Sequence, residues 1–347
     1  MKTTSTTVWL ALLLAVIASE GCRSGERGSR DAASLTIGAY TTPREVYGKA
    51  IIPTFREDLE KRTGKRIEIN ESYLGSGAQA RAIIAGFEAD VAALSLEPDI
   101  EKLRDAGLIR HDWKAGAHAG MVTRSIVVIG VREGNPKNIK TWQDLALPGI
   151  DVLTPNVRTS GGAMWNILAI YGAATRESGK AREDAHEDAV DLLAAILRNV
   201  KIMDRGARDS ILTFERGVGD AIITYENEIL VGRTKGQTYE YVIPDATILI
   251  ENPVAVIDEY AEAHGTIDTA REFVDFLWTP EMQREYARYG LRPVLDEVAK
   301  EVSDRFPAVQ ALFTIRDLGG WDEAQSLLFS KGGVYEQALT RSRTTGR

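Results

Sequence analysis

Apolar and polar positions alternate along this chain with two different periods. Short apolar runs, bounded by turn residues, predict strands over 35–40, 66–72, 91–96, 126–132, 152–155, 201–204, 221–225 and 240–244. Between most of them, the spacing of apolar residues is that of a helix lying on a core, and it predicts helices over 45–63, 78–87, 100–106, 163–174, 185–199 and 208–216. Strands that alternate with helices predict an α/β protein with mainly parallel sheets flanked by helices.

Three short glycine-rich turns, at 74–79, 158–163 and 203–208, each precede one of these helices. Such a turn leaves backbone N–H groups bare at the positive end of a helix dipole, and this combination favours an anion. One such turn alone is an ordinary strand-to-helix connection. Since all three fall at the carboxyl ends of predicted strands, where ligands bind in α/β sheets, we expect them to converge on one ligand.

The pattern also indicates two lobes. The long β-rich run at 123–132 is suited to carry the chain from one lobe to the other, and a return is expected near 246–256. We therefore predict a discontinuous first lobe, 34–125 plus 247–347, and a second lobe over 126–246. The last ~90 residues are predicted to be mostly helical.

The amino-terminal segment is typical of an exported protein. Lys2 precedes an unbroken apolar run at 8–18, which at 1.5 Å per residue reaches only ~16 Å and is too short for a membrane span. We predict a signal peptide over 1–21 and a polar, flexible tether over 22–33. Cys22, the only cysteine, follows Gly21 in a context that resembles a bacterial lipobox, so we expect a lipid on Cys22 and a periplasmic, membrane-anchored protein; plain secretion is the alternative.

Composition narrows the possible functions. A net charge of −8 argues against nucleic acid as a partner. The four histidines are scattered without metal-ligand spacing, and none is near Ser160 in sequence, so we expect no enzyme, metal or cofactor. Trp142, Trp165 and Trp321 are predicted to pack in the core.

Several motifs together resemble the periplasmic sulfate-binding proteins of ABC importers. They lie, in the same order and at similar spacing, at 75–82, 88–91, 156–163, 206–208, 215–220, 226–228, 289–293, 312–315 and 319–321. The resemblance covers nearly all of the chain after the predicted tether. It implies a two-lobed class II solute-binding fold, a monomer that captures sulfate or thiosulfate between its lobes and delivers it to a permease and ATPase complex in the inner membrane.

The resemblance also implies which residues bind the anion. Ser76, Gly161, Gly162 and Ala207 would donate backbone N–H groups, and Ser160 its hydroxyl. All of these donors are uncharged, so in this acidic chain local dipoles and hydrogen bonds, rather than net charge, would hold the ligand.

Two positions depart from the family pattern and keep the choice of anion open. Tyr225 stands where the family has a tryptophan whose indole donates, and a phenol can also accept. Thr41 replaces an aspartate that supports the site. Phosphate, molybdate or tungstate therefore remain alternatives to sulfate, and an anion-sensing module remains an alternative to a transporter component. Phosphate would be favoured if one of the nearby carboxylates, Asp204, Asp220 or Glu226, faced the ligand; we expect them instead to cap or pair.

Overall fold

The computed structural model describes residues 33–177 and 182–344. The predicted signal peptide, Cys22 and nearly all of the predicted tether lie outside these residues. In the described ranges, no helix combines the length and the apolar character that crossing a bilayer requires.

Two groups of parallel strands form the ends of one sheet. β1 is hydrogen-bonded to both β2 and β3, and β5 to both β6 and β7. Their bounds are β1 Ala33–Tyr40, β2 Ile67–Leu74, β3 Val91–Ala93, β5 Val152–Pro155, β6 Val200–Asp204 and β7 Ala221–Tyr225. All six correspond to predicted strands, although β3 ends three residues earlier than the apolar run, because the chain turns out of the sheet at Leu94.

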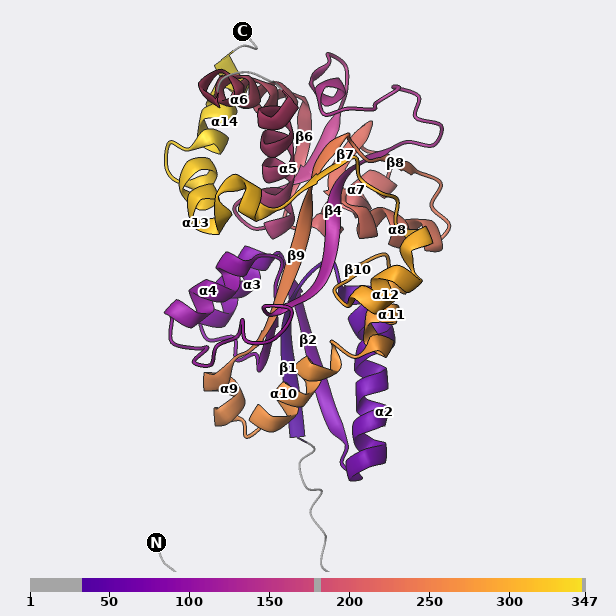
Figure 1. The fold of residues 1–347 in the computed structure, drawn as a ribbon, viewed down its shortest axis with the longest axis vertical. Coiled ribbons are helices and arrows are strands. Elements are labelled where there is room, and N and C mark those ends of the chain that lie inside the picture. Colours follow the sequence, from indigo (N-terminus) through magenta and orange to yellow (C-terminus); the bar gives the residue numbers. More distant parts are fainter. Residues whose placement is uncertain (1–32, 178–181, 345–347) are drawn as a thin grey trace, which may run out of the picture. The chain divides into compact units, whose positions relative to one another are not determined.

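Two long antiparallel strands, β4 (Met121–Val131) and β9 (Ala246–Val256), connect the groups. The carboxyl end of β9 pairs with β3, and the carboxyl half of β4 pairs with β7. β9 therefore extends the first group and β4 the second, and the pairing between β4 and β9 joins the two groups (Figure 1). The sheet is therefore mixed: the predicted parallel pairing holds within each group, and the two connecting strands add antiparallel pairs because the chain runs along them in opposite directions. Short strands β8 (Glu240–Val242), β10 (Arg292–Pro293) and β11 (Ala311–Phe313) pair with β4 or β9.

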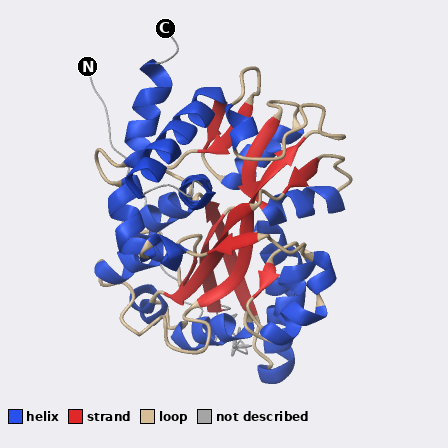
Figure 2. Ribbon diagram, turned by 45° about the horizontal axis from the view of Figure 1, so that its top comes forward, coloured by secondary structure: helices blue, strands red, loops and turns tan. Residues whose placement is uncertain are grey.

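Helices cover both groups of strands (Figure 2). Their bounds are α1 Arg44–Val46, α2 Ile52–Thr63, α3 Ser76–Ile84, α4 Glu97–Asp105, α5 Gly161–Glu177, α6 Arg182–Asn199, α7 Ala207–Glu215, α8 Glu226–Thr234, α9 Asp258–Ala263, α10 Ile267–Phe276, α11 Pro280–Arg288, α12 Asp296–Glu301, α13 Gly320–Ala324 and α14 Val334–Thr344. A π-helical segment, Tyr47–Ile51, joins α1 to α2. α3 and α5 each begin two residues before the predicted start, because the small residues at their first positions do not contribute to the apolar pattern.

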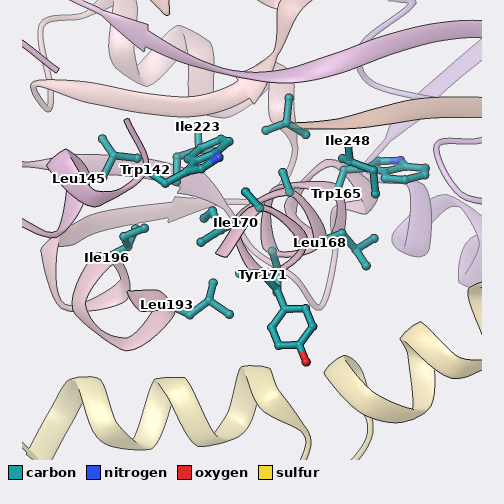
Figure 3. Packing of buried hydrophobic residues seen from close by; sticks show 14 of the residues in the cluster. Trp142, Leu145, Trp165, Leu168, Ile170, Tyr171, Leu193, Ile196, Ile223 and Ile248 are labelled. Atoms are coloured by element: carbon teal, nitrogen blue, oxygen red, sulfur yellow. The ribbon is translucent and has the colours of Figure 1, made fainter. Parts of the chain in front are cut away.

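Large aromatic residues pack in the core beside α5, as Figure 3 shows for Trp142 and Trp165. The Trp165 and Trp321 rings meet edge to face with centroids 4.9 Å apart. The indole N–H of Trp142 donates to the carbonyl of Ala246, and that of Trp165 donates to the carbonyl of Ser95, both at 3.0 Å. All three tryptophans are buried, and the prediction that they serve packing is confirmed.

Candidate functional site

Three helices begin directly at the glycine-rich turns. The residues before α3 and α7 are Gly75 and Gly206, and neither helix has a side-chain cap. The first N–H groups of a helix have no acceptor within it. Those of α3, α5 and α7 are therefore available to an external acceptor, as the sequence predicts.

The three turns meet in space. A methyl group placed on Gly75 would overlap the Thr159 carbonyl and lie 2.8 Å from the carbonyl oxygen of Arg205. The Thr159 hydroxyl donates to that same Arg205 oxygen at 2.8 Å. One residue from each turn therefore takes part in a single contact, and only a residue without a side chain fits at Gly75.

Three predicted site residues gather around a fourth, Gly162, the second residue of α5. A methyl group there would lie 2.7 Å from Cε2 of Tyr225, 3.3 Å from Cβ of Ala207 and 3.4 Å from Oγ of Ser160. Ser160 and Tyr225 are only 4% and 1% exposed, so solvent reaches neither in this conformation. Three residues from separate segments therefore lie closely packed around Gly162, and none of them carries a charge.

Ser76 is the first residue of α3, and its hydroxyl is engaged within the protein. Its hydroxyl donates to Oδ2 of Asp99 at 2.7 Å and accepts from the N–H of Ser95 at 3.0 Å. Both functions of the hydroxyl are thus occupied, whereas the N–H of Ser76, the first residue of α3, has no intrahelical partner.

Thr41, directly after β1, lies beside the third turn, since its Oγ1 would be 3.0 Å from a methyl group on Gly206. It lines a cavity of about 830 Å³ together with residues of all three turns, among them Gly75, Thr159 and Arg205. The buried donors around Gly162 do not line this cavity. It therefore lies at the turns themselves, beside the residues that surround Gly162.

A cluster of charged side chains borders the same turn. Arg208, buried at the second position of α7, bonds Glu45 at 2.9 Å and Glu228 at 3.0 Å, and Lys235 bonds Glu45 at 2.7 Å. Two positive and two negative groups thus balance one another. Arg208 therefore pairs with carboxylates.

Burial and pairing act in opposite directions on the pKa values of this cluster. Burial raises the pKa of the Glu228 carboxyl to about 6 and outweighs the opposing influence of Arg208. Burial also acts to raise the pKa of Glu45, but there Arg208 and Lys235 prevail and lower it. Near neutral pH both carboxylates are ionised, so the cluster carries no net charge.

The three carboxylates whose position bears on phosphate all hold other partners. Oδ1 of Asp204 accepts from the Thr213 hydroxyl, and Oδ2 of Asp220 accepts from the N–H of Asp151. Both oxygens of Glu226 accept from the guanidinium of Arg292, at 2.7 and 2.9 Å. Asp220 and Glu226 pair as predicted, although Glu226 does so in the interior rather than at the surface. Asp204 pairs through Oδ1 alone: its Oδ2 is buried without a hydrogen-bond partner among the described residues, and Asp204 lines the cavity at the three turns.

Three of the four histidines form side-chain hydrogen bonds away from Ser160. His111 pairs with Asp258, His186 with Tyr171, and His264 with Asp90 and Glu88. Across the described ranges, no group of three or more histidine, cysteine or acidic residues is arranged to hold a metal ion. The weak bond that the Ser160 hydroxyl accepts comes from the N–H of Ala163, at 3.4 Å.

One residue of the site, Ser95, was not found from the sequence. Its Oγ lies 2.6 Å from the Tyr225 hydroxyl oxygen. The predicted strand over 91–96 treated it as one more buried strand position. The available signal was a lone serine in an apolar run, at the end of a strand that points to the glycine turns.

Comparison with known proteins agrees with this fold. A family model described as "Bacterial extracellular solute-binding protein" matches residues 35–292. The sulfate-binding protein of Synechococcus elongatus is 40% identical over 317 residues, 91% of this chain and 89% of that protein. The thiosulfate-binding protein of Escherichia coli is 33% identical over 323 residues, 91% of this chain and 94% of that protein.

A solved structure extends the likeness to three dimensions. The sulfate-binding protein SubI of Mycobacterium tuberculosis superposes with a TM-score of 0.79 at 36% identity, covering 86% of this chain and all of that chain. The fold is thus that of an extracellular or periplasmic solute-binding protein with two lobes, which binds rather than catalyses. The chain belongs to the family of sulfate- and thiosulfate-binding proteins that serve ABC importers.

Proposed function

We propose that this protein captures sulfate, with thiosulfate as the alternative ligand, and delivers it to an ABC permease and its ATPase. The observation that carries the proposal is the meeting of the turns before α3, α5 and α7 at Gly75, Thr159 and Arg205, with Ser160, Ala207 and Tyr225 close around Gly162. The names of the relatives support the choice of anion.

The chemistry of the donors suits sulfate. Near neutral pH sulfate carries no proton, so each group around it should donate. The N–H groups of Ser76, Gly161, Gly162 and Ala207 and the hydroxyl of Ser160 all do so. A hydrogen bond to a charged acceptor contributes about 1.5–3 kcal/mol, so five such donors hold the anion without a counter-charge.

Ligand-driven closure follows from the assignment of these donors to two lobes. In our proposal 34–125 with 247–347 form one lobe, which carries Ser76, and 126–246 form the other, which carries Ser160 and Ala207. An anion bound to both favours the closed arrangement by its differential affinity. The Arg208–Glu45 ion pair and the Ser95–Tyr225 hydrogen bond also join the two proposed lobes.

We further propose that the mature protein is a monomer that begins at an acylated Cys22 and remains at the periplasmic face of a membrane. Mass spectrometry of the protein from membranes should show the loss of 1–21 and a lipid on Cys22. Cys22→Ser should move the protein to the soluble periplasmic fraction. An unmodified cysteine in the membrane-free fraction would support plain secretion instead.

Isothermal titration of the soluble form, lacking 1–32, tests the ligand. Sulfate, thiosulfate, phosphate, molybdate and tungstate should be compared for wild type, Ser160→Ala and the control Ser34→Ala. Ser34 lies at the opposite end of β1 from the site and bonds Asn70. We expect Ser160→Ala to weaken sulfate binding roughly 10- to 150-fold with unchanged unfolding, and Ser34→Ala to leave it unchanged. Equal sulfate affinity in both variants would contradict the proposed site.

A further inference from the structure

The Ser95 hydroxyl is held in place by its own main chain. The Ser95 N–H donates to Oγ of Ser76 at 3.0 Å, and the Ser95 carbonyl accepts from Trp165 at 3.0 Å and from the Asn252 amide at 3.1 Å. Ser95 and Tyr225 are each 1% exposed, and their hydroxyl oxygens lie 2.6 Å apart. The two hydroxyls therefore form a fixed, water-excluded pair.

This pair lies against the start of α5. A methyl group on Gly161 would lie 2.5 Å from Oγ of Ser95, and one on Gly162 would lie 2.7 Å from the Tyr225 ring. Glycine at both positions permits this approach. An anion bound by the first N–H groups of α5 would therefore border both hydroxyls.

The protons and lone pairs of the Ser95 and Tyr225 hydroxyls determine which hydrogen bonds the pair can form with a ligand. Burial raises the pKa of the Tyr225 phenol well above its ordinary value, so both hydroxyls keep their protons near neutral pH. One proton occupies the hydrogen bond between the two oxygens, and the other is free to donate. The oxygens also retain lone pairs that accept, whereas an indole has only its N–H donor.

We propose that Ser95 is a specificity-determining residue, which with Tyr225 forms a two-hydroxyl unit that donates to a fully deprotonated oxyanion and accepts from one that still carries a proton. This inference rests on the proposed anion-binding function. We therefore expect the site to bind hydrogenphosphate as well as sulfate. We also expect it to discriminate between these two anions less strongly than a site whose corresponding residue is a tryptophan, since an indole only donates.

Titration of wild type, Ser95→Ala, Tyr225→Phe and Ser95→Ala/Tyr225→Trp with sulfate and with inorganic phosphate at pH 7.5 tests the inference. We expect wild type to bind both. Each single variant should weaken sulfate binding about threefold and phosphate binding about tenfold, because the remaining hydroxyl loses the partner that orients it: sulfate needs only its proton, whereas hydrogenphosphate needs the same group to donate and to accept. The double variant should recover sulfate binding and lose phosphate binding by a further factor of about ten.

Ser342→Ala is the matched control, since Ser342 is also a buried serine but lies in α14 and bonds the Leu339 carbonyl. Tyr225→Phe keeps the ring volume, so it tests the unit even if Ser95→Ala perturbs folding. The inference is overturned if wild type binds sulfate but not phosphate, or if both single variants match Ser342→Ala with both anions. Wild type that binds neither sulfate nor thiosulfate would instead overturn the proposed function.

Discussion

Two neighbouring regions of this protein differ in how they use charge: one consists of uncharged hydrogen-bond donors, and the other of paired charged side chains. Around Gly162, the first residues of helices present uncharged N–H and hydroxyl donors whose partners lie outside their own helices. Around Arg208, one helical residue away from Ala207, four fully charged groups neutralise one another. The difference explains how a chain with net charge −8 can bind an anion: nearby charges cancel locally, and the ligand experiences only dipoles.

The two regions should also differ in what they stabilise. The charged cluster exists without ligand, so breaking it should act on folding. The donors around Gly162 gain their acceptor only when an anion binds, so changing them should act on affinity.

The largest expected effect comes from Arg208→Met, which leaves the buried Glu228 without its cation. We expect the free energy of unfolding to fall by about 3–5 kcal/mol, measured by urea denaturation without ligand. Arg205→Met, an exposed neighbour on the same turn, is the control and should stay within about 0.5 kcal/mol of wild type. A loss below 1 kcal/mol in Arg208→Met would mean that the cluster does not stabilise the fold.

Gly162→Ala and Gly77→Ala form a second pair, since each replaces the second residue of a helix at the site. The methyl group on Gly162 meets the Tyr225 ring at 2.7 Å, whereas that on Gly77 meets only ordinary contacts from 3.4 Å outward. We expect sulfate affinity to fall roughly 10- to 100-fold in Gly162→Ala, because overpacking costs about 1–3 kcal/mol, and to change little in Gly77→Ala. Equal affinities by titration would contradict the crowded geometry at Gly162.

The contribution of Glu228 to stability should depend on pH, and a comparison of wild type with Glu228→Gln measures it. Because burial raises its pKa in the folded protein to about 6, the folded state binds more protons than the unfolded state from pH 4.5 to 6. Stability contributed by this group therefore falls as pH rises through that window, by at most about 2 kcal/mol. Urea denaturation across pH 4.5 to 7 should show a steeper fall in wild type than in Glu228→Gln, because Glu226, whose pKa burial also raises, contributes equally to both proteins. Parallel profiles would exclude Glu228 as the source of the difference.

The smallest effect is expected for Glu45→Gln, since Glu45 is partly exposed and Arg208 keeps Glu228 as a partner. Because this change weakens a contact between the two proposed lobes, we expect sulfate affinity to fall about three- to fivefold. Glu57→Gln breaks an exposed pair with Lys61 within α2 and should leave affinity unchanged. A shift of the same size in both variants would indicate a general charge effect rather than a contact between lobes.

Much of the fold follows from local pattern. The apolar runs at 35–40 and 221–225 became β1 and β7, and the crossings expected at 123–132 and 246–256 are the two long strands β4 and β9. The antiparallel pairs that β4 and β9 form were not predicted. The direction of a strand depends on how the chain passes between the two groups of strands, and a local sequence pattern does not show this. The bounds of the two lobes and the ligand-binding roles of the site residues stay predictions.

The sequence by itself determined which segments are helices and strands and where glycines leave helix N-termini bare, because periodicity and backbone freedom are properties of neighbouring residues. It also indicated the family, through motifs that are specific only together. Only the tertiary structure decided that Ser95 bonds Tyr225 and that Glu45 pairs with Arg208, since these partners are 130 and 163 residues apart. Such pairs depend on the packing of the whole sheet, and no local pattern encodes them.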